Sequence, residues 1–485
     1  MRRFLILLAL AALVCNLALV SPGAGSSGDQ AYGHVENIVH IGSRFAGTTA
    51  EAAAASYIEN QLRSYGLQTW VENFSIGSTY VVTENRLTVV QPVQMSITCV
   101  PAIYSPSTEN VVTGQLMYAA DWSTQNPEQL RGRVLLVESG EPITDLTNVP
   151  PRAMIFFMEN QPAISAIWPD GLASQCPTVS ISGSDAHQLM ELLDNGQVTV
   201  ELRLAASSPS GTSQNVIARL PGDSDETIVV AAHHDSMLTP GAIDDASGVA
   251  VMLEIARTLS TENLQRTIMF ASFGGEELGL FGSADFVSKH KEDDKLVAAI
   301  ILDCIAAGPD NGLRIGLTDS AQYGTTEWLD GFLQQVAENF GFHAQSETVD
   351  AVGGYSDHVS FTSAGIDASW IYWVNPTSYD ILGPVHTLSD DLSAVDSTRL
   401  QQTISLGADA VRKLAAEDIE AWRWKYAFPT RVAGFTVAVL GAAAISIGLS
   451  CFVHYRRDWV WSRAVLVVLV AVVATSSVAG FLLLR

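Results

Sequence analysis

The sequence predicts an α/β fold: a mostly parallel β-sheet sandwiched by helices, together with an inserted, mainly β module. Three observations support this prediction. First, near-continuous apolar runs of strand length alternate with helical segments over residues 210–426. Second, residues 91–209 contain short β-rich runs separated by turn residues. Third, 48% of the residues are hydrophobic and 16% are charged, which supplies a large core and excludes a disordered chain. A chain of 485 residues is expected to form two or three domains.

Residues 27–90 are predicted to form the first part of the main domain. The stretch TTAEAAAASYIENQLRSYGL is helical, because it is rich in alanine and spaces Ala54, Ile58 and Leu62 along one face. Gly66 ends this helix, and QTWVENFSI follows as a strand.

Residues 91–209 are predicted to form the inserted module. Its candidate strands are GQLMYAA, GRVLLVESG, RAMIFFMEN, PTVSIS and VTVELRLAA. Its one candidate helix, SDAHQLMELLDNG, has a serine cap at its start and a glycine at its end. The stretch SSPSGTSQ has the composition of a linker and marks the boundary with the rest of the chain.

Residues 210–426 are predicted to form the core of the main domain. The runs ETIVVAA, RTIMFASF, LVAAIILD and ASWIYWV are nearly continuous apolar strands, as in a sheet that is covered on both faces. Helical segments separate them, namely ASGVAVMLEIARTLS and TEWLDGFLQQVAENF, and STRLQQTISLGADAVRKLAAE follows the last strand. This alternation is the basis of the predicted α/β sheet.

Both ends of the chain carry apolar segments that predict export and membrane attachment. Residues 1–26 have two arginines, an apolar run and then small residues, which is the layout of a signal peptide or an uncleaved anchor. Residues 427–485 are predicted as a hairpin of two transmembrane helices, because Val432–Val453 and Ala464–Leu484 each approach the ~20 apolar residues that cross a bilayer. The arginine-rich loop between these runs favours the cytoplasm, so we expect a cell-membrane protein with its main domain outside the cytoplasm.

The charge of the chain excludes nucleic acid as a partner. The sequence contains 51 acidic and 26 basic residues, for a formal net charge of −25. A surface of this sign repels phosphate. It also helps to keep the protein soluble.

Polar side chains gather where the predicted strands end. Ligand sites of open α/β sheets lie outside the carboxyl ends of the strands, in the loops that follow them. The acidic and imidazole residues at these positions are His233, His234, Asp235, Asp244, Asp245, Glu276, Glu277 and Asp303, with His386 in the loop before the last helix. We therefore expect these side chains to form one site.

The types of these side chains point to metal ions. Several carboxylates that converge on one place repel one another unless cations compensate. Histidine together with carboxylates is a typical zinc ligand set. A pair of zinc ions needs a shared carboxylate, and a carboxylate that binds no metal can then accept a proton from water.

Five motifs in this order resemble the co-catalytic zinc aminopeptidase family, whose members include bacterial leucyl aminopeptidases, aminopeptidase Y, glutamate carboxypeptidase and glutaminyl cyclase. The motifs are His-x-Asp-Ser at 233–236, Gly-Ala-x-Asp-Asp-x-Ser-Gly at 241–248, Glu-Glu at 276–277, Leu-Asp at 302–303 and His-Thr-x-x-Asp at 386–390. The resemblance covers roughly residues 30–90 and 210–418.

The resemblance implies a role for each residue of the motifs. The zinc ligands would be His233, Asp244, Glu277, Asp303 and His386. Asp244 aligns with the carboxylate that bridges the metals, so we expect two Zn²⁺ per chain. Glu276 aligns with the general base, and Asp235 would orient His233 from outside the ligand shell. Because consecutive residues of an extended segment point in opposite directions, only one of His233 and His234 needs to face a metal.

One position departs from the pattern of the family. Its secreted aminopeptidases often have a tyrosine just before the late histidine, where it steadies the tetrahedral intermediate. This chain has Val385 there, and Tyr355 or Tyr372 are the alternatives. Asp390, four residues after the histidine, resembles a supporting carboxylate.

The inserted module resembles the protease-associated domain. The stretches GRVLLVESG and PTVSISGSDAHQLMELLDNGQVTVEL carry the likeness. In the aminopeptidase Y and glutamate carboxypeptidase branches this domain lies between the start region and the zinc core. The resemblance implies that the module covers the cleft and narrows access of substrates.

The leading hypothesis is a zinc aminopeptidase that acts on peptide substrates outside the cell. A metal-bound hydroxide would attack the amide, with Glu276 transferring the proton to the leaving amine. One alternative is a glutaminyl cyclase-like transamidase with a single zinc ion, and another is a receptor or scaffold without activity. Suitable residue types at all five ligand positions favour an enzyme, and the number of metals per chain separates the two enzymatic hypotheses.

Overall fold

The computed structural model describes residues 26–119, 127–139, 151–166, 175–306, 312–318, 322–348, 354–374 and 384–426. The chain divides into two compact units, residues 1–326 with 333–416, and residues 327–332 with 417–485. The predicted signal segment before Ser26 and the predicted membrane hairpin at 427–485 lie outside the described residues. None of the described helices is at once long enough and apolar enough to cross a membrane.

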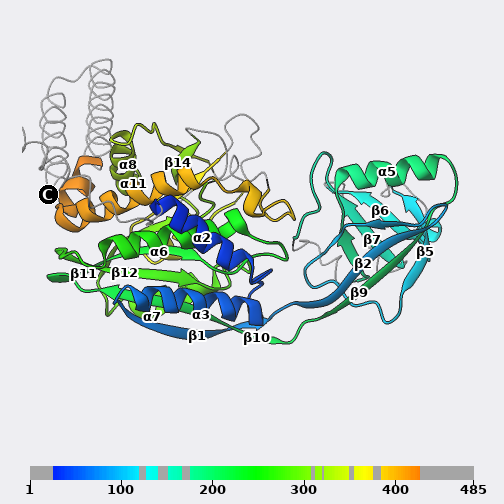
Figure 1. Cartoon of the computed structure of the whole chain (residues 1–485), viewed down its shortest axis with the longest axis horizontal. Coiled ribbons are helices and arrows are strands. Elements are labelled where there is room, and N and C mark those ends of the chain that lie inside the picture. Colours follow the sequence, from blue (N-terminus) through cyan, green and yellow to red (C-terminus); the bar gives the residue numbers. More distant parts are fainter. Residues whose placement is uncertain are drawn as a thin grey trace, which may run out of the picture. The chain divides into compact units, whose positions relative to one another are not determined.

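An eight-stranded mixed sheet forms the centre of the first unit (Figure 1). Its strands, in spatial order, are β1 (Gln68–Ser78), β10 (Ser210–Leu220), β12 (Arg266–Phe273), β11 (Ser224–His233), β13 (Leu296–Leu302), β16 (Ala368–Trp373), β14 (Leu313–Leu317) and β15 (Gln345–Glu347). Strands β12, β11, β13 and β16 are parallel neighbours, as are β14 and β15. The remaining pairs, β1–β10, β10–β12 and β14–β16, are antiparallel, so the sheet is less uniformly parallel than predicted.

Helices cover both faces of this sheet. On one face lie α2 (Ser27–Val39), α6 (Gly248–Leu259) and α11 (Ser397–Ala416), which pack against one another. Helix α3 (Thr49–Ser64) lies beside them, where it contacts α6 and where Tyr57 of α3 bonds His34 of α2. On the other face lies α7 (Phe281–His290), and α10 (His358–Ser363) packs against α7 and β16. The first unit also contains the short turns η3 (Ala242–Ser247) and η4 (Leu392–Ala394). Helix α8 (Glu327–Glu338) has its first half in the second unit.

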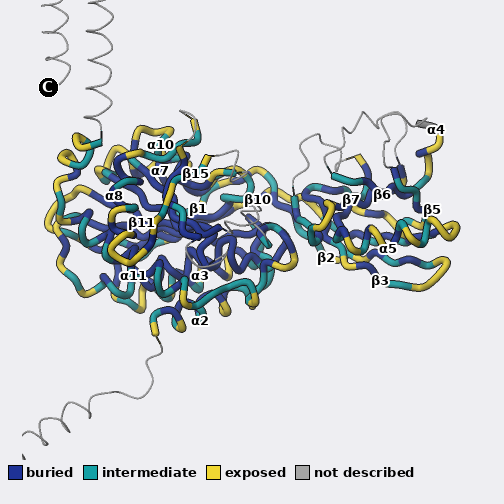
Figure 2. Tube along the Cα trace, turned by 90° about the horizontal axis from the view of Figure 1, so that it is seen from above, coloured by how far each residue is buried: buried dark blue, intermediate teal, exposed yellow. Residues whose placement is uncertain are grey.

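The central strands contain continuous apolar runs because both of their faces are covered. Residues 228–232 of β11 and 268–271 of β12 are at most 1% exposed, and Figure 2 shows this part of the chain as buried. An apolar run without alternation is the expected pattern for a strand with helices on both sides. The sheet therefore gives the residues that follow its strands a rigid base.

A second eight-stranded sheet is formed by residues 81–207, whereas the sequence predicts an inserted module at 91–209. From here on, the inserted module means residues 81–207. Its spatial order is β3 (Met95–Ile97), β2 (Val81–Gln91), β9 (Thr199–Ser207), β5 (Val112–Tyr118), β6 (Val134–Glu138), β7 (Ala153–Phe157), β8 (Thr178–Ser180) and β4 (Val100–Pro101). Helices α4 (Pro127–Leu130) and α5 (Gly183–Asp194) belong to the same stretch, and Leu189 of α5 packs into the core with Leu136 and Ile155.

The stretch SSPSGTSQ lies where β9 of the second sheet is followed by β10 of the first, but most of its residues belong to β10 and do not form a linker. Strand β2, which the sequence placed in the main domain, pairs with β9 of the inserted module.

Candidate metal centre

Three neighbouring parallel strands end at the same edge of the first sheet. Strand β11 ends at His233, and Asp303 directly follows β13. Strand β12 ends at Phe273, and two glycines then lead to Glu276 and Glu277. Because β12, β11 and β13 are parallel and adjacent, their carboxyl ends bring these side chains to one place.

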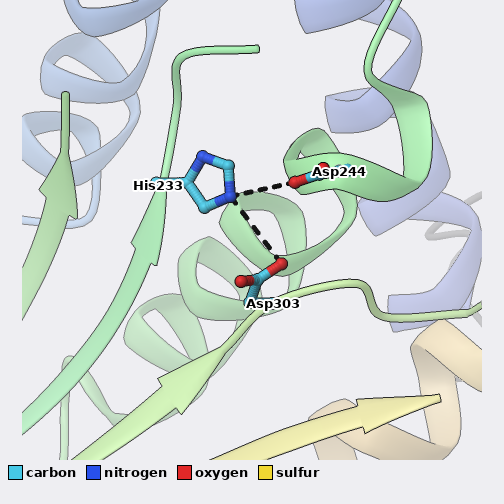
Figure 3. Close-up of side chains that lie close together, drawn as sticks. All are labelled: His233, Asp244 and Asp303. Carbon is cyan, nitrogen blue, oxygen red and sulfur yellow. Dashed lines mark ion pairs between the residues drawn. The ribbon is translucent and has the colours of Figure 1, made fainter. Parts of the chain in front are cut away.

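His233, Asp244 and Asp303 lie together and form what we call the inner group (Figure 3). Nε2 of His233 is 3.0 Å from Oδ1 of Asp244 and 3.7 Å from Oδ1 of Asp303. All three residues are buried. Asp244 comes from η3, the turn that precedes α6.

Asp244, Glu277 and His386 form what we call the outer group. Nε2 of His386 is 3.0 Å from Oδ2 of Asp244 and 2.9 Å from Oε2 of Glu277. The two oxygens of Asp244 thus face different histidines, one in each group. The side chain of His386 is 31% exposed, whereas those of Asp244 and Glu277 are 8% and 4% exposed.

Both groups have the composition and spacing of metal ligands. Within each group the candidate ligand atoms all lie within 4.8 Å of one another. Both ring nitrogens of His233 and Oδ1 of Asp303 are buried without a hydrogen-bond partner in the described structure. Buried polar atoms are normally paired, and a cation in the inner group would satisfy Nε2 of His233 and Oδ1 of Asp303. The residues present therefore fit two metal ions that share Asp244.

Asp235 connects the strand that carries His233 with the turn that carries the glutamates. Its Oδ1 lies 3.5 Å from Nδ1 of His233 and accepts the N–H of Glu276 at 3.1 Å. Its Oδ2 accepts the N–H of Glu277 at 3.2 Å. One buried carboxylate thus lies next to an imidazole and accepts the backbone N–H groups of both glutamates, whereas the sequence predicts only its place beside His233.

Two further carboxylates hold the backbone around Asp244. Asp390 accepts the N–H of Ile243 at 2.6 Å and that of Asp244 at 3.2 Å. Asp245 accepts the N–H of His233 at 3.2 Å and that of Gly248 at 2.8 Å. The sequence suggests the support by Asp390 but assigns no role to Asp245, because an adjacent Asp-Asp pair does not reveal which oxygens face the site.

His234 points away from both groups. Its Nδ1 lies 3.0 Å from the hydroxyl of Ser272, and its Nε2 lies 3.3 Å from Nε2 of Gln214. Burial lowers the pKa of His234 to about 4, so it is neutral at physiological pH. This geometry agrees with the alternation expected of an extended segment.

The charges of Asp244 and Glu276 differ because their surroundings differ. Burial alone would raise the pKa of Asp244, but the neighbouring imidazoles of His233 and His386 hold it well below its ordinary value. Burial raises the pKa of Glu276 well above its ordinary value, and the charges of Asp357 and Asp303 act in the same direction. Asp244 is therefore the stronger anion, and Glu276 the better proton acceptor.

The two candidate tyrosines make contacts of their own. The hydroxyl of Tyr372 is buried and donates to the carbonyl of Gly316 at 3.4 Å. Tyr355 is exposed and stacks on Tyr323 with ring centroids 4.7 Å apart. Neither of these contacts assigns the oxyanion-stabilising role.

Two neighbouring residues of the inserted module contact the loop of His386: Ile164 forms an isolated β-bridge with Thr387, and Ser165 bonds His386 itself. The N–H of Ser165 donates to the carbonyl of His386 at 2.7 Å, and its hydroxyl accepts the N–H of Leu238 at 3.2 Å. Ser165 is completely buried. Sequence reasoning missed this contact, because a single serine in a loop carries no signal of a partner 221 residues away (386 − 165).

Comparison with known proteins supports a peptidase. The sequence pattern of Peptidase family M28 matches residues 215–411. Aminopeptidase YwaD of Bacillus subtilis is 28% identical over 382 residues, which cover 76% of this chain and 81% of that protein. A probable leucine aminopeptidase of Trichophyton verrucosum is 33% identical over 201 residues, which cover 38% of this chain and 52% of that protein.

Solved structures agree with these matches. BSAP, a zinc aminopeptidase from Bacillus subtilis, is 27% identical with a TM-score of 0.64, covering 81% of this chain and 95% of that one. A Peptidase M28 precursor from Shewanella amazonensis has the same TM-score at 21% identity and shares the fold. Together the matches show that the chain is an enzyme, a peptidase, in which residues 215–411 are similar to Peptidase family M28.

Proposed function

We propose that this chain, a zinc aminopeptidase of the M28 type, removes N-terminal residues from peptides outside the cell by means of two metal ions. The observation that carries the proposal is the position of Asp244. Its two oxygens face the histidines of two separate ligand groups, as a carboxylate shared by two metals must.

The two groups divide the metal ligands between them. His233 and Asp303 would hold one zinc ion, Glu277 and His386 the other, and Asp244 both. When bound, such a pair polarises a carbonyl and makes water more acidic. The carboxylates of the two groups would repel one another without these cations.

Glu276 is the proposed general base. It belongs to neither ligand group, and its backbone N–H is held by Asp235 at 3.1 Å next to the ligand Glu277. Burial raises its pKa, so its carboxylate accepts a proton from water and returns it to the leaving amine. Asp235 acts on this step indirectly, by fixing the turn that carries both glutamates.

The setting of the enzyme is part of the proposal. The apolar segments within residues 1–26 and 427–485 support export and attachment to the cell membrane by a C-terminal hairpin. The separate sheet of the inserted module supports its likeness to a protease-associated domain. The contact of Ser165 with the His386 loop supports a role of this module at the cleft.

The full-length enzyme, purified in detergent, tests the function. We expect two zinc ions per chain by metal analysis and cleavage of aminoacyl anilides but not of N-acetylated ones. Glu276→Gln should retain both metals and lose turnover by roughly 10²–10⁴-fold, the usual contribution of a general base.

Two results would contradict the proposal. A single zinc ion together with cyclisation of N-terminal glutamine would support the transamidase instead. A Glu276→Gln enzyme with unchanged turnover would reject the role of that residue, and Glu338→Gln on α8 serves as its matched control.

A further inference from the structure

Arg44 is a completely buried cation next to the segment that joins His233 to Asp244. It lies in the loop between α2 and α3, outside residues 215–411 that match the peptidase family. Its exposed fraction is 0%. A buried guanidinium is costly unless its N–H groups are paired, so its contacts show what the fold gains from it.

The guanidinium donates to three main-chain carbonyls of one segment. Nε donates to the carbonyl of His234 at 2.9 Å, 190 residues away in sequence. Nη1 donates to Pro240 at 2.6 Å and Nη2 to Gly241 at 2.8 Å. These carbonyls lie at the two ends of residues 234–241, the segment that joins His233 to the turn carrying Asp244.

The backbone of Arg44 holds the middle of the same segment. Its N–H donates to the hydroxyl of Ser236 at 3.0 Å, and its carbonyl accepts the N–H of Ser236 at 3.3 Å. All of these groups are buried. Start, middle and end of the segment are thus fixed by one residue.

The fit between Arg44 and the segment leaves no free space at Gly241. Gly241 has a φ of +59°, and a Cβ added there would lie 2.7 Å from Nη2 of Arg44. The same Cβ would lie 2.5 Å from the carbonyl oxygen of Asp244. The guanidinium therefore lies next to the turn that carries the shared carboxylate.

The charge of Arg44 suits this place. Burial lowers its pKa, whereas the charges of Asp390, Asp235 and Asp244 act to raise it. Its hydrogen bonds nevertheless go to neutral carbonyls, so it leaves the oxygens of these carboxylates available for other partners. A planar fork with several N–H groups can serve three carbonyls at once, and a lysine ammonium has no such shape.

We propose that Arg44 is a positioning residue that sets the distance between His233 and Asp244 and thereby the affinity of the inner group for its metal. The inference rests on the proposed function, because it takes these residues as metal ligands. It adds a determinant of that site from a part of the chain that precedes the peptidase match.

The test compares Arg44→Lys with Arg266→Lys in the full-length protein. Arg266 is a matched control, because its guanidinium also donates to main-chain carbonyls, those of Leu414 and Ala415 at the end of α11. Cobalt(II) alone is the probe: its dissociation constant is measured by equilibrium dialysis, and its visible spectrum reports the ligand geometry.

We expect Arg44→Lys to weaken the tighter cobalt site by roughly 10- to 100-fold and to change its spectrum, the range typical of residues that orient ligands. We expect Arg266→Lys to leave both unchanged, even if it lowers the unfolding temperature as much. If both variants and the wild type have equal cobalt affinity and equal spectra, Arg44 only stabilises the fold and the proposal is wrong.

A second variant covers the case in which Arg44→Lys does not fold. Ser236→Ala removes the hydroxyl that accepts the N–H of Arg44. A rise of the cobalt dissociation constant by about threefold or more, the size expected for the loss of one hydrogen bond, supports the proposal, and no change overturns it.

The two proposals fail in different ways. Wild-type protein that binds no cobalt and cleaves no peptide contradicts the proposed function. Wild-type protein that binds two metals and cleaves peptides, with metal affinity insensitive to both Arg44→Lys and Ser236→Ala, contradicts only the role of Arg44.

Discussion

The inner and outer groups share Asp244 but are held by different kinds of structure. His233 and Asp303 of the inner group stand at the ends of adjacent strands in the centre of the sheet. In the outer group, His386 comes from a loop and has a φ of +60°. The side chain of His233 is 1% exposed and that of His386 31%.

The inner group therefore holds its side chains more rigidly, whereas the outer group is more accessible to solvent. Strand ends in a covered sheet fix ligands with little freedom, and burial excludes competing water. A loop ligand at the surface is less constrained and more open to solvent and substrate. We expect the inner group to keep its metal and the outer group to exchange it, so the two can be separated by mutation.

The largest effect is expected from Asp244→Asn, which removes the feature common to both groups. An amide offers one acceptor oxygen and no charge, so neither site keeps its ligand set. We expect less than one zinc ion per chain and a loss of kcat/KM beyond the ~10⁴-fold that a general base contributes at most. Metal analysis and hydrolysis of an aminoacyl anilide measure both, with exposed Asp225→Asn as control. Two retained metals would show that Asp244 is not shared.

His386→Ala is expected to empty the outer group and leave the inner one filled. The variant should bind one zinc ion with wild-type affinity and the second at least ~100-fold more weakly, beyond the usual cost of a lost supporting contact. Isothermal titration of the metal-free protein resolves the two steps. Equal weakening of both steps would mean that the groups do not act as separate sites.

Asp235→Asn is expected to affect both groups to a similar extent. The carboxylate lies 3.5 Å from His233 and also accepts the N–H groups of Glu276 and Glu277. An amide retains one acceptor, so we expect a loss of roughly 10- to 100-fold in metal affinity or turnover. An effect confined to the outer group would disprove the link to His233.

Ser165→Ala is expected to have the smallest effect and to act on the outer group alone. The substitution removes the acceptor of the Leu238 N–H but leaves the bond from the Ser165 N–H to His386. We expect the outer metal to dissociate about threefold faster, since one neutral hydrogen bond contributes ~1 kcal/mol or less. Stopped-flow transfer of zinc to a chelator measures this rate. A change in the inner metal would contradict the division between the groups.

His233, Glu277 and Asp303 could be found from the sequence because they lie at or just after the ends of strands with a clear pattern. Strands β11, β12 and β13 each contain a continuous apolar run, and polar residues soon after such runs are easy to recognise. The rule that sites lie at the carboxyl ends of strands then brings the residues together without any knowledge of side-chain geometry.

Strand β10 was missed because its polar residues are buried. Ser213 and Gln214 belong to the stretch that suggested a linker, yet they and Asn215 lie in the sheet at 8% exposure or less. Ser213 bonds Glu51, and Asn215 donates to Gly282 at 2.8 Å. The partners that make such burial acceptable come from distant segments, and composition does not reveal them.

Arg44 and Ser165 escaped prediction for the same reason. Each forms hydrogen bonds with main-chain atoms of a segment far away in sequence. Any residue can supply such atoms, so the local sequence pattern does not reveal the partner. Helix α2 was also missed, although its buried residues Ala31, Val35 and Ile38 recur at helical spacing. The polar residues between them obscured this period.

The two crossings between the first sheet and the inserted module lie side by side. Ser78 pairs with Ser210 at the end of the β1–β10 ladder, and Val81 pairs with Ser207 at the start of the β2–β9 ladder. The Cα atoms of antiparallel partners are about 5 Å apart, so a tight turn is long enough to join Ser78 directly to Ser210 if the module is removed. An ancestral gene could therefore acquire or discard the whole module in a single recombination event without reordering the peptidase strands. The module is in this sense a cassette, and its exchange offers a route by which such enzymes diversify.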